Sequence, residues 1–466
     1  MSRWWAAALA APVAASLPHW LPASVIALRV RIFDLVNGET GLPTPSDRLP
    51  IGDFKRLYGH PAANGRSAGA ALSDLFWYWL SPGPQVHQEH LEPGPRYEDV
   101  AKTTRRILAR LDRTAWAELV TRATSRIADE LGAHEPRRVR LRDLMMPIWA
   151  EVYYELVFAE PCPRAVRDLI TGNADDVVHS LKCTRPRHMR RRARLTGYLR
   201  ERIATDPPAE PLPAALTTQE QAYYLQGAFF NTAVVQMSEA MAHLLLAVAT
   251  NPAVQDRLVA DPLDDTYLDH VIDETLWHYP LFGIAHRITT AEIPATANCP
   301  AVPTGSVLLF DYPRYQQGDR DHRFDPDRWN TPETRPPQYI PFGMATNRPC
   351  PARGFATLTM RVCAREMLRR YHLDSAVEHT RSLPSRGPCV LTPRGMARPT
   401  RIRLAAMRWR DRWETVPRSL IQLVLGSWMV YDARRKRLCE NYFADRQPIA
   451  SRGPHDATNP PDRPTP

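Results

Sequence analysis

The segment 339–356, YIPFGMATNRPCPARGFA, holds the residues with the clearest chemical potential in the chain. Arg348 lies two residues before Cys350, and a long helical pattern is expected to begin directly after Pro351. The dipole and free N–H groups at a helix N-terminus stabilise a thiolate, which can ligate a metal or act as a nucleophile. Phe342 can shield such a sulfur from water. The segment therefore predicts a metal-binding Cys350, with simple burial of this cysteine as the alternative.

This segment resembles the haem-binding loop of the cytochrome P450 family, whose order is Phe-x-x-Gly-x-Arg-x-Cys-x-Gly. The resemblance implies haem b ligated by the Cys350 thiolate, with Phe342 over the sulfur and Arg348 on a haem propionate. An axial thiolate donates electron density to iron and favours O–O cleavage. The loop departs from the family in its spacing, because one extra residue separates Phe342 from Cys350. Thr346 takes the place of the loop glycine, and Ala352 that of the glycine after the cysteine.

A second resemblance lies in residues 273–287, DETLWHYPLFGIAHR, which are similar to the family's Glu-x-x-Arg helix and the strand after it. Glu274 takes the glutamate position, and the match implies that Arg287 binds a propionate. Trp277 stands where the family has arginine. Loss of one partner from a buried charge network costs about 3–5 kcal/mol unless the surroundings repack, and Trp277 suggests such repacking.

A third stretch, residues 324–329 (FDPDRW), resembles the family's meander motif. The match implies that Arg328 bridges to Glu274. We expect Glu274 to pair with Arg328 alone or with help from His278.

The longest helical pattern, Thr218–Thr250, stops before Pro252 and resembles the helix that crosses over the haem. Thr218 with Gln221 is expected to form a capping box at its start. The family has an acid–alcohol pair whose threonine lies sixteen residues before this proline and which delivers protons. Gln236 occupies that position here, so it is our candidate catalytic residue, with a satisfied core amide as the alternative. Thr232 could serve only if the helix shifts.

The chain of 466 residues is 44% apolar, which is enough for a sizeable core. Its pattern, together with the resemblance over roughly residues 40–400, predicts a mainly α cytochrome P450-like haem-thiolate fold with a small β region. We expect four parts: an apolar N-terminal arm (1–39), the haem domain (40–400), a C-terminal helical extension (401–446) and a disordered tail (447–466).

The seven cysteines are odd in number and widely spaced, which argues against a disulfide framework and for a reducing, cytoplasmic compartment. The N-terminal run is apolar from Trp4 onward but contains Pro12, Pro18 and Pro22. A spanning helix needs about 20 uninterrupted apolar residues. We therefore expect this arm to pack on the domain, with membrane association through residues 1–28 as the alternative.

The net charge of +10 fits a basic surface or an acidic partner. The arginine-rich run from Arg187 to Arg194 is expected to be a solvated helix face, because no nucleic-acid module accompanies it. His87 and His90 are expected to be ordinary loop or helix-cap residues rather than metal ligands.

The resemblance implies a monooxygenase that oxidises a small organic metabolite, as in natural-product biosynthesis. Electrons would come from a separate, acidic ferredoxin-type protein, because the chain has no flavin or dinucleotide fingerprint. Arg361, Arg365 and Arg369 are the expected docking residues. One alternative is peroxide-driven, dehydration or rearrangement chemistry on the same haem, since the acid–alcohol pair is missing. Another is a non-catalytic helper of the same fold.

Overall fold

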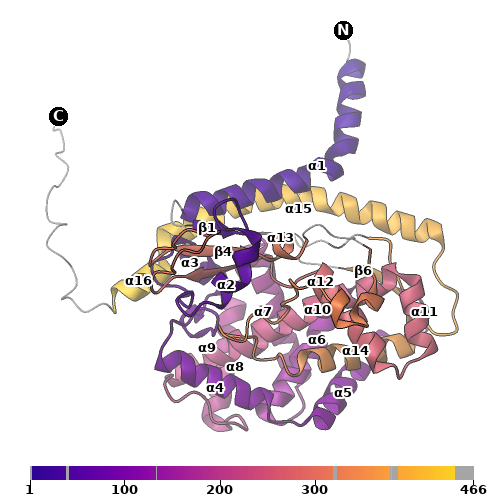
Figure 1. Cartoon of the computed structure of the whole chain (residues 1–466). Coiled ribbons are helices and arrows are strands. Elements are labelled where there is room, and N and C mark those ends of the chain that lie inside the picture. Colours follow the sequence, from indigo (N-terminus) through magenta and orange to yellow (C-terminus); the bar gives the residue numbers. More distant parts are fainter. Residues whose placement is uncertain are drawn as a thin grey trace.

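Helices dominate the computed structural model, and two small sheets lie at its edges (Figure 1). The structure describes residues 3–37, 41–132, 134–317, 323–377, 379 and 387–446. The fold is the mainly α one predicted from the sequence, with its small β region. The predicted disordered tail lies outside the described residues.

Between residues 41 and 217, the described part of the chain contains seven α-helices. They are α2 (Phe54–Gly59), α3 (Ala71–Leu80), α4 (Pro95–Leu108), α5 (Arg113–Leu131), α6 (Leu141–Phe158), α7 (Arg164–Leu181) and α8 (Met189–Thr205). Short 3-10 turns η2 (Ile51–Asp53) and η3 (Pro84–Val86) separate some of them. The second half contains α11 (Pro252–Ala260), α12 (Asp265–His278), α13 (Tyr312–Gln317), η5 (Pro326–Trp329), η6 (Pro332–Thr334) and α14 (Ala356–Arg370).

Within the described residues, the strands form two three-stranded sheets. The first has the order β1 (Gly41–Thr44), β4 (Val307–Asp311), β3 (Ile284–Ile288), with β1 parallel and β3 antiparallel to β4. The second has the order β2 (Arg137–Arg140), β6 (Pro388–Pro393), β5 (Tyr371–Asp374), all antiparallel. The turn before β4 has a glycine, Gly305, at a φ of 80°, a left-handed backbone that glycine adopts without strain.

The long distal segment runs through α9 (Thr218–Gly227), a π-helical turn η4 (Ala228–Ala233) and α10 (Val234–Thr250). Its N-terminus has a capping box, as predicted, but the box is formed by Thr217 and Glu220. The predicted pair, Thr218 and Gln221, was therefore wrong by one residue. A box needs its first residue outside the helix, and Thr217 has the extended backbone that fits. The segment is long and apolar enough to cross a membrane, yet most of its window is buried against the rest of the domain. It is therefore the core helix of the fold, and α10 packs along α6.

Two further helices flank the domain at its ends in sequence. α1 (Arg3–Asn37) continues through Pro12, Pro18 and Pro22. The prediction that these prolines would interrupt a helix was therefore wrong. Figure 1 shows α1 bending, as helices with internal prolines do. α15 (Arg401–Lys436) lies beside it and is followed by α16 (Leu438–Ala444).

Candidate functional site

Cys350 lies in a tight turn that precedes α14. Its backbone N–H donates to the carbonyl of Phe342 (3.0 Å), which fixes the loop across the cysteine. We expected the helix to begin after Pro351, near Gly354, and α14 starts at Ala356, because residues 351–355 form turns. Burial raises the pKa of the Cys350 thiol, and a hydrogen bond from the backbone N–H of Ala352 opposes this. The turn, rather than a helix dipole, supplies the donor to the sulfur.

Arg348 lies on the same loop with a left-handed backbone, at a φ of 49°. Its Nη1 donates to the carbonyl of Leu91 (2.6 Å), and its guanidinium carbon lies 3.7 Å from the ring centre of Tyr97. The Nε and Nη2 atoms are buried without a hydrogen-bond partner among the described residues. Burial lowers the pKa of Arg348 to about 10. Buried donors of this kind are rare unless a ligand satisfies them.

Arg287 lies on β3 and faces the same region. Its Nη2 donates to the Tyr58 hydroxyl (2.7 Å) and its Nη1 to the carbonyl of His286 (2.9 Å). Its Nε is also buried without a partner in the part of the chain that the structure describes. Two arginines named from the sequence, Arg287 and Arg348, thus come together with free donors.

Arg66 completes a cluster of three arginines, and sequence reasoning missed it. It is only 2% exposed, and its Nη1 donates to the carbonyl of Gly65 (3.1 Å). Burial, and then the charges of Arg287 and Arg348, lower its pKa. No motif marks this position, because it becomes significant only when the 60–70 loop pairs with β3 through Gly65 and Ile288.

Two glutamates face this arginine cluster. Glu92 holds the Arg66 loop by accepting from the backbone N–H groups of Ser67 (2.6 Å) and Ala68 (2.8 Å). Glu89 has an exposed side chain, yet burial raises its pKa and the charges of Arg66 and Arg287 oppose this. Glu89 therefore lies close to Arg66 and Arg287.

These residues fit haem. Three guanidinium groups close to one another, two of them with unsatisfied buried donors, suit two propionate carboxylates. Cys350 supplies the thiolate, and metal coordination deprotonates a thiol even where burial raises its pKa. Phe342 is half-buried and packs against the main hydrophobic core.

Glu274 is fully buried on α12 and is the centre of a hydrogen-bond network. Arg328 Nε lies 3.0 Å from Oε2, and His278 Nε2 lies 3.0 Å from Oε1. Two donors that were not expected add to these: the indole N–H of Trp329 (2.8 Å) and the backbone N–H of Asp325 (2.7 Å). The carboxylate thus gains indole and backbone donors where the family has a second arginine.

Trp277 packs where that arginine would stand. It is 2% exposed, and the guanidinium carbon of Arg328 lies 4.9 Å from its ring centre. A cation over an indole face gains about 0.5–2 kcal/mol. Trp277 therefore contacts the remaining arginine through its ring.

The distal segment places Gln236 in the first turn of α10, directly after the π-helical turn. Gln236 is half-buried, as are Thr232 and Val235, while Asn231 and Met237 are buried. π-Helical turns concentrate at functional sites and shift the phase of the residues that follow. Thr232 and Gln236 therefore share one face of the segment.

His87 and Gly227 meet at the start of this π-helical turn. A Cβ on Gly227 would lie 2.1 Å from His87 Nε2, so only glycine fits there. His87 forms the C-cap of η3, as expected, and burial lowers its pKa to about 4. No group of three or more His, Cys, Asp or Glu side chains suited to a metal occurs among the described residues.

The arginine-rich segment behaves differently from its prediction as a solvated face. Arg192 is fully buried and pairs with Asp176 (2.5 Å), and Arg187 lies 3.3 Å over the ring of Tyr78. These two arginines fasten α8 to α3 and α7. Arg190 and Arg194 are exposed.

The expected docking arginines on α14 are largely paired. Arg361 and Arg365 both contact Asp265, and Arg369 pairs with Glu366 (2.8 Å). Arg353 is exposed three residues after Cys350.

Comparison with known proteins agrees with this geometry. Residues 215–397 match the family model described as Cytochrome P450. The protein named cytochrome P450 135B1 of Mycobacterium tuberculosis is 34% identical over 140 residues, which are 27% of this chain and 29% of the relative. Cytochrome P450 6B1 of Papilio polyxenes is 26% identical over 179 residues, or 33% and 34% of the two chains. The matches span about a third of the curated relatives' length.

Solved structures share the fold over a longer stretch. A zebra fish cytochrome P450 bound to abiraterone aligns with a TM-score of 0.60 at 16% identity, covering 76% of this chain and 94% of the other. A cyanobacterial protein, CYP120A1, bound to retinoic acid, aligns with a TM-score of 0.57 at 17% identity, covering 72% and 86%.

Proposed function

Because this chain belongs to the cytochrome P450 family, we propose that it is a haem-thiolate monooxygenase that oxidises a small organic molecule. The observation that carries the proposal is the cluster of Arg66, Arg287 and Arg348 beside Cys350, with buried donors that have no protein partner among the described residues. Haem b held there supplies dioxygen activation and oxidation of a nearby substrate.

The protein's own residues position the cofactor. Cys350 donates its sulfur from a turn whose N–H groups limit the charge on the thiolate. Phe342 excludes water from the sulfur, and the Glu274 network holds the meander against α12.

Gln236 has the proposed role of holding a water molecule by hydrogen bonds on the distal side, where its amide can both donate and accept. Ala228, Ala233 and Val235 on the same segment are half-buried and apolar. They favour an apolar or amphipathic metabolite, and natural-product biosynthesis is our proposed setting.

The proposed electron donor is a separate, acidic ferredoxin-type protein. Arg353 is exposed close to Cys350, and it replaces the paired α14 arginines as the first residue to test for docking. All seven cysteines are free, which fits the proposed cytoplasmic location.

The absorption spectrum of the reduced, carbon-monoxide-bound protein tests the proposal. We expect the Soret shift of a thiolate ligand in the parent and its loss in Cys350→Ser. A Cys363→Ser variant is the matched control, because Cys363 is buried in the core away from the loop and should leave the spectrum unchanged. An identical spectrum in Cys350→Ser would contradict the assignment, and a parent that takes up no haem would favour the helper alternative.

A second candidate function is peroxide-driven, dehydration or rearrangement chemistry on the same haem. The observation that favours it is that Val235 and Gln236 replace the acid–alcohol pair in the distal segment. Turnover with peroxide, but none with dioxygen and reduced ferredoxin, would support this candidate over the first.

A further inference from the structure

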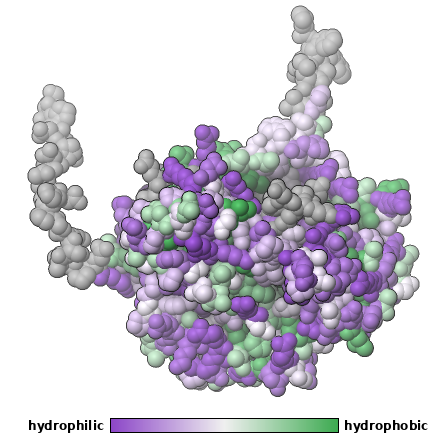
Figure 2. All heavy atoms as spheres, in the orientation of Figure 1, coloured by the Kyte–Doolittle hydropathy of each residue, from purple (hydrophilic) through white to green (hydrophobic). Residues whose placement is uncertain are grey.

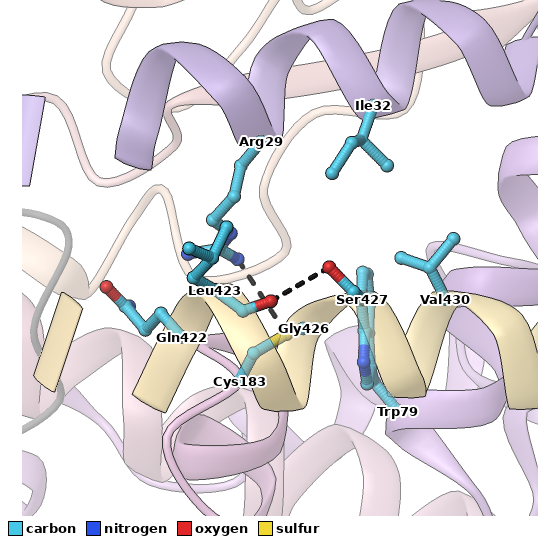
Figure 3. A pocket seen from close by; sticks show the side chains of 9 residues that line it. All are labelled: Arg29, Ile32, Trp79, Cys183, Gln422, Leu423, Gly426, Ser427 and Val430. Carbon is cyan, nitrogen blue, oxygen red and sulfur yellow. Dashed lines mark hydrogen bonds between the residues drawn. The ribbon is translucent and has the colours of Figure 1, made fainter. Parts of the chain in front are cut away.

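Two helices outside the matched family segment, α1 and α15, lie side by side along one side of the domain (Figure 1). They run in the same direction, since Arg29 and Ile32 of α1 face Gln422 to Val430 of α15 across a small apolar pocket (Figure 3). Arg29 Nη2 donates to the Leu181 carbonyl (3.4 Å) and lies 3.9 Å from Cys183 Sγ. The pair is thus docked on the domain, next to α7.

The inner face of α15 is buried, and its outer face is not. Met407, Val416, Gly426 and Met429 lie on the buried side, and Gln422 Nε2 donates to the Lys182 carbonyl (2.8 Å). The helix is therefore held in one orientation, and its outward residues are fixed.

That outer face is apolar in the C-terminal half of α15, from Leu420 to Tyr431, whereas exposed arginines lie among Ile402 and Trp409 in its N-terminal half. Of the eighteen large apolar side chains that are exposed among the described residues, twelve lie on these two helices. Figure 2 shows apolar and hydrophilic residues intermingled over the face in view. Large exposed apolar patches mark interaction sites. The twelve are Trp20, Ile26, Leu28, Val30 and Leu35 on α1, and Ile402, Trp409, Leu420, Ile421, Val424, Trp428 and Tyr431 on α15.

Positive charge borders this apolar surface. The thirteen residues from Ser419 to Tyr431 contain no charged side chain, and Arg418 precedes them. Arg435 and Lys436 follow them at the C-terminal end and are exposed, and both pair with the single carboxylate of Asp432. α15 as a whole has nine basic and three acidic residues, a net charge of +6.

We propose that α1 and α15 together form an interfacial surface that binds anionic phospholipid membranes. Trp and Tyr with an apolar stripe and bordering Arg and Lys are the composition of a helix that lies in the headgroup–acyl boundary. Basic residues near an anionic lipid surface strengthen such binding. A second copy of this chain would bring like charge against like charge, which disfavours a symmetric contact here.

Flotation of the full-length protein with lipid vesicles tests the proposal. We expect binding to vesicles of phosphatidylglycerol and phosphatidylcholine, and weaker binding to phosphatidylcholine alone and at high salt. The Val424→Glu, Trp428→Glu double variant should lose binding by at least about tenfold. Both positions are exposed, so folding should be preserved, and the thermal unfolding midpoint checks this.

Leu263→Glu is the matched control, because Leu263 is an 82% exposed apolar residue away from both helices and should not affect binding. Three outcomes would overturn the proposal. The parent could fail to bind anionic vesicles, or the α15 variant could bind as the parent does, which would assign the contact to residues 1–28. The third outcome is that the parent binds no vesicles and forms a dimer in sedimentation, and that the variant dissociates this dimer.

Discussion

The side chains that decide the cofactor assignment are three arginines with different surroundings. Arg66 is satisfied by backbone carbonyls, whereas Arg287 and Arg348 keep buried N–H groups for a further acceptor. A charged donor without an acceptor is costly when buried, so the arrangement is favourable only with an anionic ligand in place. The carboxyl of Glu89 shares this region and interacts with two of these charges.

Replacing Arg348 with alanine is therefore expected to weaken haem binding rather than the fold. A charge-assisted hydrogen bond contributes about 1.5–3 kcal/mol, which corresponds to roughly 10- to 100-fold in affinity. The rate of haem transfer to apomyoglobin measures this loss. Arg353→Ala removes an exposed arginine from the same loop and should transfer haem at the parent's rate. Equal rates for all three proteins would contradict a propionate role for Arg348.

At Glu274 the expected effect is on stability. Glu274→Gln keeps the shape but removes the charge that faces Arg328, at a cost of about 3–5 kcal/mol in unfolding free energy. Urea denaturation measures it. Asp327→Asn breaks an exposed ion pair with Arg257 and should cost no more than about 1 kcal/mol. If the two variants are equally stable, the network around Glu274 is not a stabilising one.

Among the elements, the distal segment depends most on a single small residue. α9 passes into the π-helical turn at Gly227, where the ring of His87 occupies the space of a side chain. The contact joins the turn after η3 to the helix that carries Gln236. The π-helical turn therefore has an identifiable partner outside its own helix.

Gly227→Ala should destabilise the protein by about 1–3 kcal/mol, because the new methyl group overlaps the buried imidazole. His87→Ala in the same chain should recover much of that loss, which separates this clash from a general helix effect. Gly197→Ala on α8 is the control: nothing lies within 4 Å of its Cβ, and the change should stabilise by up to about 1 kcal/mol. No recovery in the double variant would rule out the proposed contact.

Sequence patterns predicted those elements whose determinants are local. The end of the distal segment at Thr250 was predicted from its apolar pattern and from Pro252, which follows it. The π-helical turn could not be predicted, because it arises from packing of the distal segment against α6 and α7. Arg66 could not be predicted for the same reason, because its neighbours Arg287 and Arg348 are more than 200 residues away in sequence.

On the scale of the whole molecule, α1 and α15 lie along the same side of the domain. α1 precedes the first sheet and α15 follows the second, and both contact α3. The proposed membrane surface is thus attached to the domain through α3 as well as through the end of α7.

Asp74 on α3 contacts the end of α15 and the start of α16, so its loss should affect the structure of that region. It is 2% exposed on α3 and accepts from Arg434 Nη1 (2.9 Å) and from the backbone N–H of Cys439 (2.9 Å). Asp74→Asn leaves the charge of Arg434 half-buried without its partner, so α16 and the end of α15 should open more often. Hydrogen exchange of residues 434–444 should accelerate by at least about tenfold, with the haem spectrum unchanged. Asp445→Asn, an exposed change near the same end, should exchange at the parent's rate. Unaltered exchange in Asp74→Asn would mean that apolar packing alone holds the extension to the domain.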